Sequence, residues 1–229
     1  MGEHDLRILP YEYDDELIDA TLTDRMPRVR VDRPRRTSVV LGRGSKPEDE
    51  LDVEACLQDG VPVLKRRGGG CSVVLDTGNL IVSVILPMKG TLNAGKLFDP
   101  LSGWLIRGLQ QIGIKGVYSD GISDLVLEDR KIGGACIYRS KEILYYSTTL
   151  LVHPAMDKVT RYLRHPPREP EYRKGRSHAL FMGSLAPFYW SHGVDTLSRS
   201  LRGVLCPGDA MLAVKGGTDG RKLGSGDGR

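Results

Sequence analysis

The amino-acid sequence predicts an α+β fold built on a mixed, mostly antiparallel β-sheet flanked by helices. Two observations lead to this prediction. Apolar runs of strand length follow one another, and segments of helical periodicity stand before and after them without strict strand–helix alternation. The composition, 40% hydrophobic and 27% charged in 229 residues, is that of a globular chain, which at this length buries about 70% of its surface.

The predicted elements of the first third begin with an amphipathic helix over residues 13–25, where apolar residues recur at helical spacing. The apolar run 37–41 predicts a short buried strand that ends at Gly42. Pro47 followed by three acidic residues predicts a helix start, and this helix is expected to stop at Gly60. Residues 61–65 predict the next strand.

The remaining elements follow from the same periodicities. Strands are predicted at residues 72–75, 79–86, 125–127, 131–138 and 143–152. Helices are predicted at residues 97–112, after Pro154 and, as the last helix, at 187–205, while the proline-rich segment 164–175 is predicted to be a loop. Residues 1–215 are predicted to form a single domain, and the Gly-rich residues 216–229 a disordered tail.

Composition and charge exclude several function classes. The net charge of +4 is too small to indicate a nucleic-acid-binding surface, and no apolar run approaches the roughly 20 residues that a membrane span needs. The chain begins without the pattern of a signal peptide, so a cytoplasmic location is expected. The four cysteines form no CxxC pair and the histidines show no ligand spacing, so no metal site built by the protein is predicted.

The strongest local signal is the glycine-rich segment 65–72, with Arg66 and Arg67 before the run Gly68–Gly70. Three consecutive glycines leave backbone N–H groups accessible, and such a loop can bind an anion together with the two arginines. The spacing is not that of a Walker loop or of a GxGxxG motif. A glycine-rich hairpin turn with two solvated arginines is the alternative interpretation.

A second signal is Lys131, which precedes the small residues Gly133, Gly134 and Ala135. Little side-chain bulk would shield a ligand from its amine. On its own, a lysine between two strands is more often a solvated turn residue. A functional role therefore requires that the fold brings Lys131 to the glycine loop.

The order of these segments resembles the lipoate–protein ligase family. That family shows VxxGRxQ, then RRxSGGGAVxHDxGN and later NDLxxxxRKxSGxA. Here the corresponding segments are VVLGR at 39–43, RRGGGCSVVLDTGN at 66–79, and SDLVLEDRKIGGA at 123–135. Residues 145–152 resemble the family's HHGTLLL strand, and the resemblance covers roughly residues 36–205.

The resemblance implies a biotin/lipoate-ligase catalytic fold and a two-step reaction. ATP and lipoate form lipoyl-AMP with Mg²⁺, and the lipoyl group then passes to a specific lysine of a lipoyl-domain or other carrier protein. Lys131 is implied as the catalytic residue that contacts the lipoate carboxyl and the α-phosphate. The other implied binding positions are Arg67, Gly68, Gly69, Gly70, Cys71, Ser72, Val73, Val74, Leu75, Asp124 and Ala135. Val74 and Val82 are candidates for an apolar slot that accepts the acyl chain.

The sequence departs from the family pattern at three positions. Cys71 stands for the third family glycine, Leu75 for the family histidine and Ser123 for the family asparagine. If the third glycine needs a positive φ, Cys71 is strained or the loop is shifted. The chain also resembles a short form without the C-terminal accessory domain, which implies that a separate accessory protein could be required.

Two other function classes remain open. The first is a cysteine-dependent octanoyltransferase that uses octanoyl-acyl carrier protein without ATP, with Cys71 or Cys136 as the nucleophile. The second is a non-catalytic module that binds a lipoyl protein. A biotin ligase is less well supported, since a GRGRxG-type loop is missing.

Overall fold

The computed structural model describes residues 6–90, 93–189 and 193–219, and the strands of these residues form two sheets. The larger sheet is antiparallel throughout and has the order β2–β6–β10–β9–β8–β7. Its strands are β2 (Arg28–Asp32), β6 (Asn79–Pro87), β10 (Ile143–Leu151), β9 (Arg130–Arg139), β8 (Asp124–Leu127) and β7 (Tyr118–Asp120). The smaller sheet has the order β1–β4–β3–β5 and mixes parallel with antiparallel pairs. Its strands are β1 (Ile8–Pro10), β4 (Val63–Lys65), β3 (Ser38–Leu41) and β5 (Val73–Leu75).

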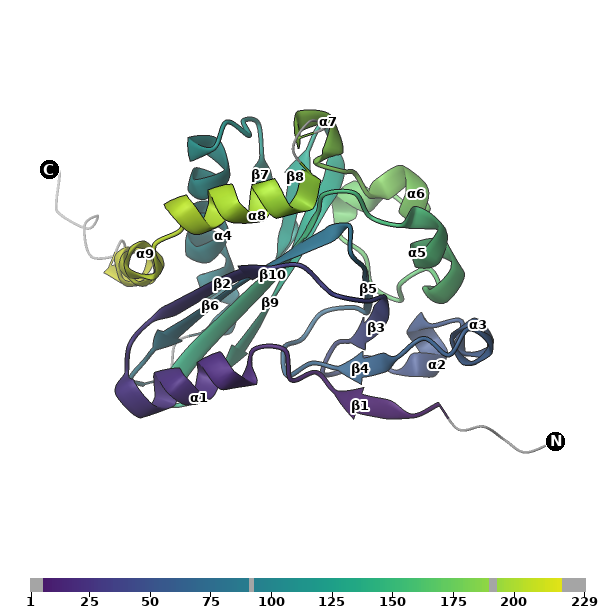
Figure 1. Ribbon diagram of the computed structural model, residues 1–229, viewed down its shortest axis with the longest axis horizontal. Helices are drawn as coiled ribbons and strands as arrows, with labels where there is room; N and C mark the ends of the chain where they lie inside the picture. Colours follow the sequence, from purple (N-terminus) through teal and green to yellow (C-terminus); the bar gives the residue numbers. More distant parts are fainter. Residues whose placement is uncertain (1–5, 91–92, 190–192, 220–229) are drawn as a thin grey trace, which may run out of the picture.

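The helices cover the two faces of the large sheet unequally (Figure 1). On one face lie α4 (Phe98–Gln111), α8 (Gly193–Val204) and α9 (Pro207–Asp219), and on the other lies α1 (Asp15–Asp24). Beside the small sheet are α2 (Pro47–Glu50), α3 (Val53–Gln58) and α5 (Met156–Tyr162). The remaining short helices are α6 (His178–Phe181), α7 (Ala186–Tyr189) and the 3₁₀ helices η1 (Ala94–Leu97) and η2 (Glu171–Arg173).

Strand β6 shows how the two faces differ. Successive side chains of a strand point to opposite faces. Leu80, Val82 and Val84 pack in the large core with α4, α8 and α9, whereas Ile81 and Ile85 belong to clusters on the opposite face. Ser83, also on that opposite face, is buried. This face, which α1 covers in part, is the one that carries the site described below.

A β-bulge in β9 decides where Lys131 points. Leu125 pairs with Gly133 and Val126 with Lys131, so Ile132 is one extra residue between them. An extra residue reverses the alternation of faces along a strand. Ile132 packs in the helical core, and Lys131 shares the opposite face with Gly134.

The predicted α+β class with a mostly antiparallel sheet is confirmed, and two helix predictions are wrong. The single helix expected over 47–60 is broken at Leu51, which pairs with Leu163, and at Asp52, whose carboxylate accepts a hydrogen bond from Ala55 N at 2.8 Å and starts α3. The segment 187–205 contains most of α7 and all of α8, and it does not hold the last helix.

The last helix of the described residues is α9, which begins with Pro207 at its first position and reaches Asp219. It therefore continues past the expected domain boundary at residue 215. Ala210 and Val214, one turn apart, are buried in the large core and hold α9 on the sheet. Residues 220–229 of the expected tail lie outside the described residues. None of the helices in the described part of the chain is long and apolar enough to cross a lipid bilayer.

Candidate functional site

The glycine loop 65–72 connects β4 to β5 and rests on the large sheet. A Cβ on Gly68 would lie 2.8 Å from Cys136 Sγ, so the loop touches β9 directly. A Cβ on Gly42 would lie 1.8 Å from Gly70 O, which requires glycine at this close backbone contact. Gly70 adopts φ +92°, and Cys71 is not among the residues with positive φ, so the substitution of the third family glycine causes no strain there.

The backbone of this loop has unused donors. Within the described residues, no N–H group from Gly68 to Cys71 donates a hydrogen bond. A Cβ added to Gly69 would meet no atom within 4 Å, so this position is open. Consecutive free N–H groups form a concave donor surface that favours anions.

Both arginines of the loop have partners within the protein, although Arg67 is also exposed to solvent. Arg66 Nη2 donates to Gly69 O and Cys71 O, both at 2.8 Å, and so fixes the course of the loop. Arg67 Nη2 lies 2.8 Å from Asp15 Oδ2, and its guanidinium carbon lies 5.9 Å from the centre of the Tyr138 ring. Arg67 thus ties the loop to the start of α1.

Ser72 has a buried acidic partner that the sequence did not reveal. Its N–H and its hydroxyl both donate to Glu50 Oε2 at 2.6 Å. Glu50 is 5% exposed and ends α2, although the sequence suggested only an acid near a helix start. The contact fixes the end of the glycine loop against the small sheet's helices.

Lys131 forms an ion pair on the site face of the large sheet. Its Nζ lies 2.7 Å from Asp124 Oδ1, and Tyr172 donates its hydroxyl to Asp124 Oδ2 at 3.0 Å. A Cβ on Gly134 would lie 3.0 Å from Lys131 Nζ, so the lysine side chain passes over a position that only glycine leaves free. The predicted pair Lys131 and Asp124 is therefore brought together, and Tyr172 is an addition from the structure.

Residues 164–182, which we call the strap, link the glycine loop to Lys131. Cys71 Sγ donates to Arg168 O at 3.7 Å at one end. At the other end, Met182 pairs with Lys131, whose carbonyl accepts a hydrogen bond from Gly183 N at 2.7 Å. The segment 164–175, expected to be a loop, contains η2 and is held against the protein by these contacts.

The geometry of β9 places Lys131 close to the loop, because Gly68 lies against Cys136 and the Lys131 amine lies over Gly134, the preceding position on the same face of the strand. Burial raises the pKa of the Cys71 thiol, the charge of Glu50 raises it further, and the charges of Arg168, Lys131 and Arg66 oppose this. The condition that the fold brings Lys131 to the glycine loop is met.

Other predicted site residues lie apart from this space. Val74 and Leu75 are buried in two hydrophobic clusters, so their side chains are not available to a ligand, whereas Val73 is half-buried. Ala135 and the candidate slot residue Val82 pack in the helical core on the opposite face of the large sheet. Alternation along β9 and β6 therefore removes their side chains from the site.

A buried polar network lies on the site face of the large sheet and was not predicted. Asp14 Oδ2 accepts hydrogen bonds from Ser83 Oγ at 2.6 Å and Tyr145 Oη at 2.8 Å, and Ser83 Oγ lies 3.0 Å from the hydroxyl oxygen of Ser147. Burial raises the pKa of the Asp14 carboxyl. The only sequence signal was an aspartate preceding the first helix.

The two cysteines at the site have the wrong environment for a nucleophile. Burial raises the pKa of the Cys136 thiol, as it does for Cys71. Reactive cysteines have lowered pKa values because the thiolate is the nucleophile.

No group of three or more His, Cys, Asp or Glu side chains that could hold a metal ion is formed by the residues that the structure describes. Asp124 is the carboxylate paired with the Lys131 amine. Nucleotide-bound Mg²⁺ takes most of its ligands from phosphates and water and needs one or two carboxylates. The donor set fits Mg²⁺ carried by nucleotide phosphates.

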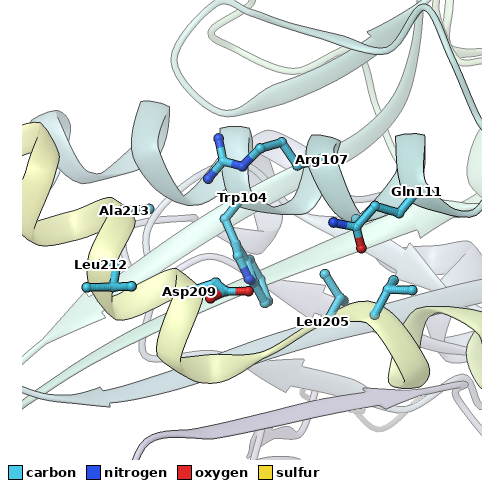
Figure 2. A pocket seen from close by; sticks show the side chains of 9 residues that line it. Trp104, Arg107, Gln111, Leu205, Asp209, Leu212 and Ala213 are labelled. Atoms are coloured by element: carbon cyan, nitrogen blue, oxygen red, sulfur yellow. The ribbon is translucent and has the colours of Figure 1, made fainter.

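A hollow of about 280 Å³ lies elsewhere, between α4 and α9 (Figure 2). Trp104, Arg107 and Gln111 of α4 face Leu212 and Ala213 of α9 across it. It is on the helical side of the large sheet, opposite the glycine loop, and Trp104 Nε1 donates to Cys206 O at 3.1 Å. It therefore belongs to the packing of α9.

Comparison with known proteins identifies a family that this chain matches. The family model described as the lipoyl protein ligase A/B catalytic domain matches residues 10–202. Lipoate-protein ligase LplJ of Bacillus subtilis is 30% identical over 129 residues, which are 56% of this chain and 38% of that protein. A putative lipoate-protein ligase A of Aeropyrum pernix is 30% identical over 115 residues, which are 50% of this chain and 42% of that protein. The chain thus spans about two fifths of the length of these relatives.

Solved structures share the fold. A lipoate-protein ligase A bound with ATP superposes with a TM-score of 0.70 at 19% identity and covers 96% of both chains. A putative lipoate protein ligase of Thermoplasma acidophilum with bound lipoic acid gives 0.68 at 18% identity, covering 94% of this chain and 93% of that one. A bipartite ligase of the same organism, studied with its E2 lipoyl domain, gives 0.66 at 20% identity, covering 93% and 82%.

Proposed function

The chain belongs to the family of lipoyl protein ligase A/B catalytic domains, and from this premise we propose that it is an ATP-dependent lipoate–protein ligase. Lipoate and ATP form lipoyl-AMP and pyrophosphate, and the lipoyl group then passes to a lysine amine of a carrier protein with release of AMP. The observation that carries the proposal is the Lys131–Asp124 pair, which lies close to a loop with four N–H groups that have no acceptor among the described residues. Lipoic acid and ATP are bound by structures of the same fold.

The first step joins two anions, so the site must offset the repulsion between a carboxylate and the α-phosphate. A preorganised cation stabilises the charge that develops during phosphoryl transfer. Lys131 carries a compact ammonium on a flexible stem and can contact both groups. Asp124 holds this ammonium in place at 2.7 Å, and Tyr172 in turn fixes Asp124. Mg²⁺ bound to the phosphates would supply further positive charge.

The glycine loop supplies the second set of contacts. Gly68, Gly69, Gly70 and Cys71 offer their N–H groups, and Ser72 is fixed by Glu50 behind them. These donors are suited to the carboxylate of lipoate or to a phosphate oxygen. Arg67 acts in this account through its pair with Asp15, which keeps the loop against α1.

The carrier is proposed from the chemistry of the reaction and from the T. acidophilum ligase, whose partner is an E2 lipoyl domain. We propose a lipoyl domain or related carrier as the acceptor, in the cytoplasm where ATP is available. Because that ligase is bipartite, a separate accessory protein is a further proposal for this chain.

Octanoyl transfer through a cysteine is the competing chemistry. It is not favoured, since burial raises the pKa of both thiols near the loop. A non-catalytic binding module is not favoured either, because the Lys131–Asp124 pair is intact.

The test is incubation of the protein with ATP, Mg²⁺, lipoate and a panel of acceptor domains, followed by intact-mass measurement of each acceptor. The expected result is a lipoyl mass increment on one acceptor that needs both ATP and lipoate. A parallel reaction contains octanoyl-acyl carrier protein without ATP. Modification only in this second reaction would replace the ligase by the acyltransferase.

A further inference from the structure

Arg173 is a buried cation with an unused donor. Its side chain is 5% exposed within the strap, where Nε donates to Arg176 O at 3.0 Å and lies 3.3 Å from Glu169 Oε2. The guanidinium carbon lies 4.7 Å from the centre of the Phe181 ring. Nη2 is buried and has no hydrogen-bond partner among the residues that the structure describes.

Such an arrangement is costly in the absence of a ligand. A buried donor of a charged group that makes no hydrogen bond loses its water without compensation. Glu169 compensates only in part, because its carboxylate is shared with His165 and with the N–H of Gly175. Burial lowers the pKa of Arg173, and the charge of Glu169 opposes this shift.

The position of Arg173 connects it to the proposed reaction. The preceding residue, Tyr172, donates to Asp124, which holds Lys131. The Arg173 guanidinium lies against Phe181, and the next residue, Met182, pairs with Lys131. The strap therefore holds a second cation in the neighbourhood of Lys131.

We propose that Arg173 is a phosphate-binding residue whose Nη2 donates to an oxygen of the nucleotide's phosphate chain. This inference rests on the proposed function and names the residue that would neutralise the phosphates alongside Lys131. A guanidinium suits this role because its planar set of donors matches phosphate oxygens. The bound phosphate would supply the partner that Nη2 otherwise lacks.

A neighbouring arginine provides the matched control. Arg176 also lies over Phe181, at 5.5 Å, but its donors are used within the protein. Nε donates to Arg173 O, Nη1 to Asp129 and Nη2 to Tyr172 O. Arg176 therefore has a structural role in the same strap.

The experiment compares the wild type, Arg173→Met and Arg176→Met by calorimetric titration with MgATP, pyrophosphate and adenosine, and it records each melting temperature. Arg173→Met should weaken ATP and pyrophosphate binding by at least about tenfold, the usual scale of a charged hydrogen bond, and leave adenosine binding unchanged. Arg176→Met should lower the melting temperature without changing the ratio of ATP to adenosine affinity. An unchanged ATP affinity in folded Arg173→Met, or an equal fall of the ratio in both variants, would overturn the inference.

If Arg173→Met does not fold, the inference is tested instead by the hydrogen exchange of backbone amides in the wild type, measured with each ligand. ATP and pyrophosphate should protect residues 164–182, and adenosine should not. Equal exchange with ATP and adenosine contradicts a phosphate contact, as does a wild type that binds neither ATP nor pyrophosphate. Because no titration contains lipoate, a phosphate effect at Arg173 without lipoate-dependent turnover would leave this inference standing and remove the proposed function. Lipoate-dependent turnover by the wild type, together with an unchanged ATP affinity of Arg173→Met, would leave the proposed function standing and overturn this inference.

Discussion

At the scale of single residues, the orientation of Lys131 depends on two neighbouring positions in β9. The extra residue Ile132 turns the lysine to the site face, and Gly134 leaves room for its side chain. A Cβ on Gly134 would also lie 3.6 Å from Asp124 Oδ1. The Lys131–Asp124 ion pair therefore requires a residue without a side chain at position 134 of β9.

Gly134→Ala tests this dependence. The new methyl group would meet the flexible end of Lys131 at 3.0 Å and displace it, while the backbone of β9 can stay. We expect lipoyl-AMP formation to fall about 10- to 100-fold, the scale reported for small misplacements of reacting groups, with little change in melting temperature. Gly203→Ala on α8, where a Cβ meets nothing within 4 Å, is the control and should retain full activity. Full activity of Gly134→Ala would contradict the role of this position.

The cysteine alternative has its own residue-scale prediction. Replacement of both Cys71 and Cys136 by Ser should leave most of the ligation rate, because an acyl-adenylate reacts with an amine without a thioester. The rate of acceptor modification is measured by intact mass. The adenylate route would be contradicted if the wild type carries an acyl group on either cysteine and the double variant loses both this acyl group and the activity.

Sequence reasoning could reach Lys131 and the glycine run because both lie in short, ordered motifs. It could not reach their partners. Glu50 contacts Ser72 from 22 residues away, and Tyr172 contacts Asp124 from 48 residues away. Arg67, which the family resemblance places at the substrate, also pairs with Asp15, 52 residues distant, and this pairing leaves no local pattern.

At the scale of elements, Asp14 joins the start of α1 to β6 and β10. Its carboxylate accepts from Ser83 and Tyr145 and lies 3.3 Å from Arg30 Nη1 of β2. Burial raises its pKa, although hydrogen bonds from Ser83 and Tyr145 oppose the shift. The folded carboxyl therefore retains its proton to a higher pH than the unfolded carboxyl.

The pH dependence of stability follows from this direction. As pH rises from the unfolded value of 3.8 through the higher folded pKa, the folded state holds more protons, so the free energy of unfolding falls. Asp14→Asn should remove this contribution and flatten the slope in that window. Urea unfolding at several pH values measures it. The same slope in wild type and variant would show that Asp14 does not titrate as described.

Long apolar elements were predictable and short amphipathic ones were not. β6 and β10 pair over nine residues, and both were evident as apolar runs because they are buried on two faces. β2 alternates Arg with Val at a sheet edge and was missed, as were β1 and β7 with three residues each. The break between α2 and α3 depends on Leu163 and Tyr162, which pair with Leu51 and Asp52 from a distant segment.

At the scale of the whole molecule, the site forms where the two sheets meet. The glycine loop belongs to the small sheet, whereas Lys131 and Asp124 belong to the large one (Figure 1). Gly68 against Cys136, Arg67 against Asp15 and the strap hold the two parts together. Local sequence patterns contain no information about this junction, and the family resemblance was needed to expect it.

The central claim is that Lys131 activates lipoate as an adenylate. The most direct measurement is lipoate-dependent exchange of labelled pyrophosphate into ATP by the wild type and by Lys131→Met, with melting temperatures taken on the same samples. The wild type should exchange only when lipoate is present. The variant, which retains the apolar stem without the charge, should fold and exchange at least about 10²-fold more slowly. Near-normal exchange by a folded Lys131→Met variant would contradict this claim. Exchange by the wild type at the same rate with and without lipoate would contradict it as well.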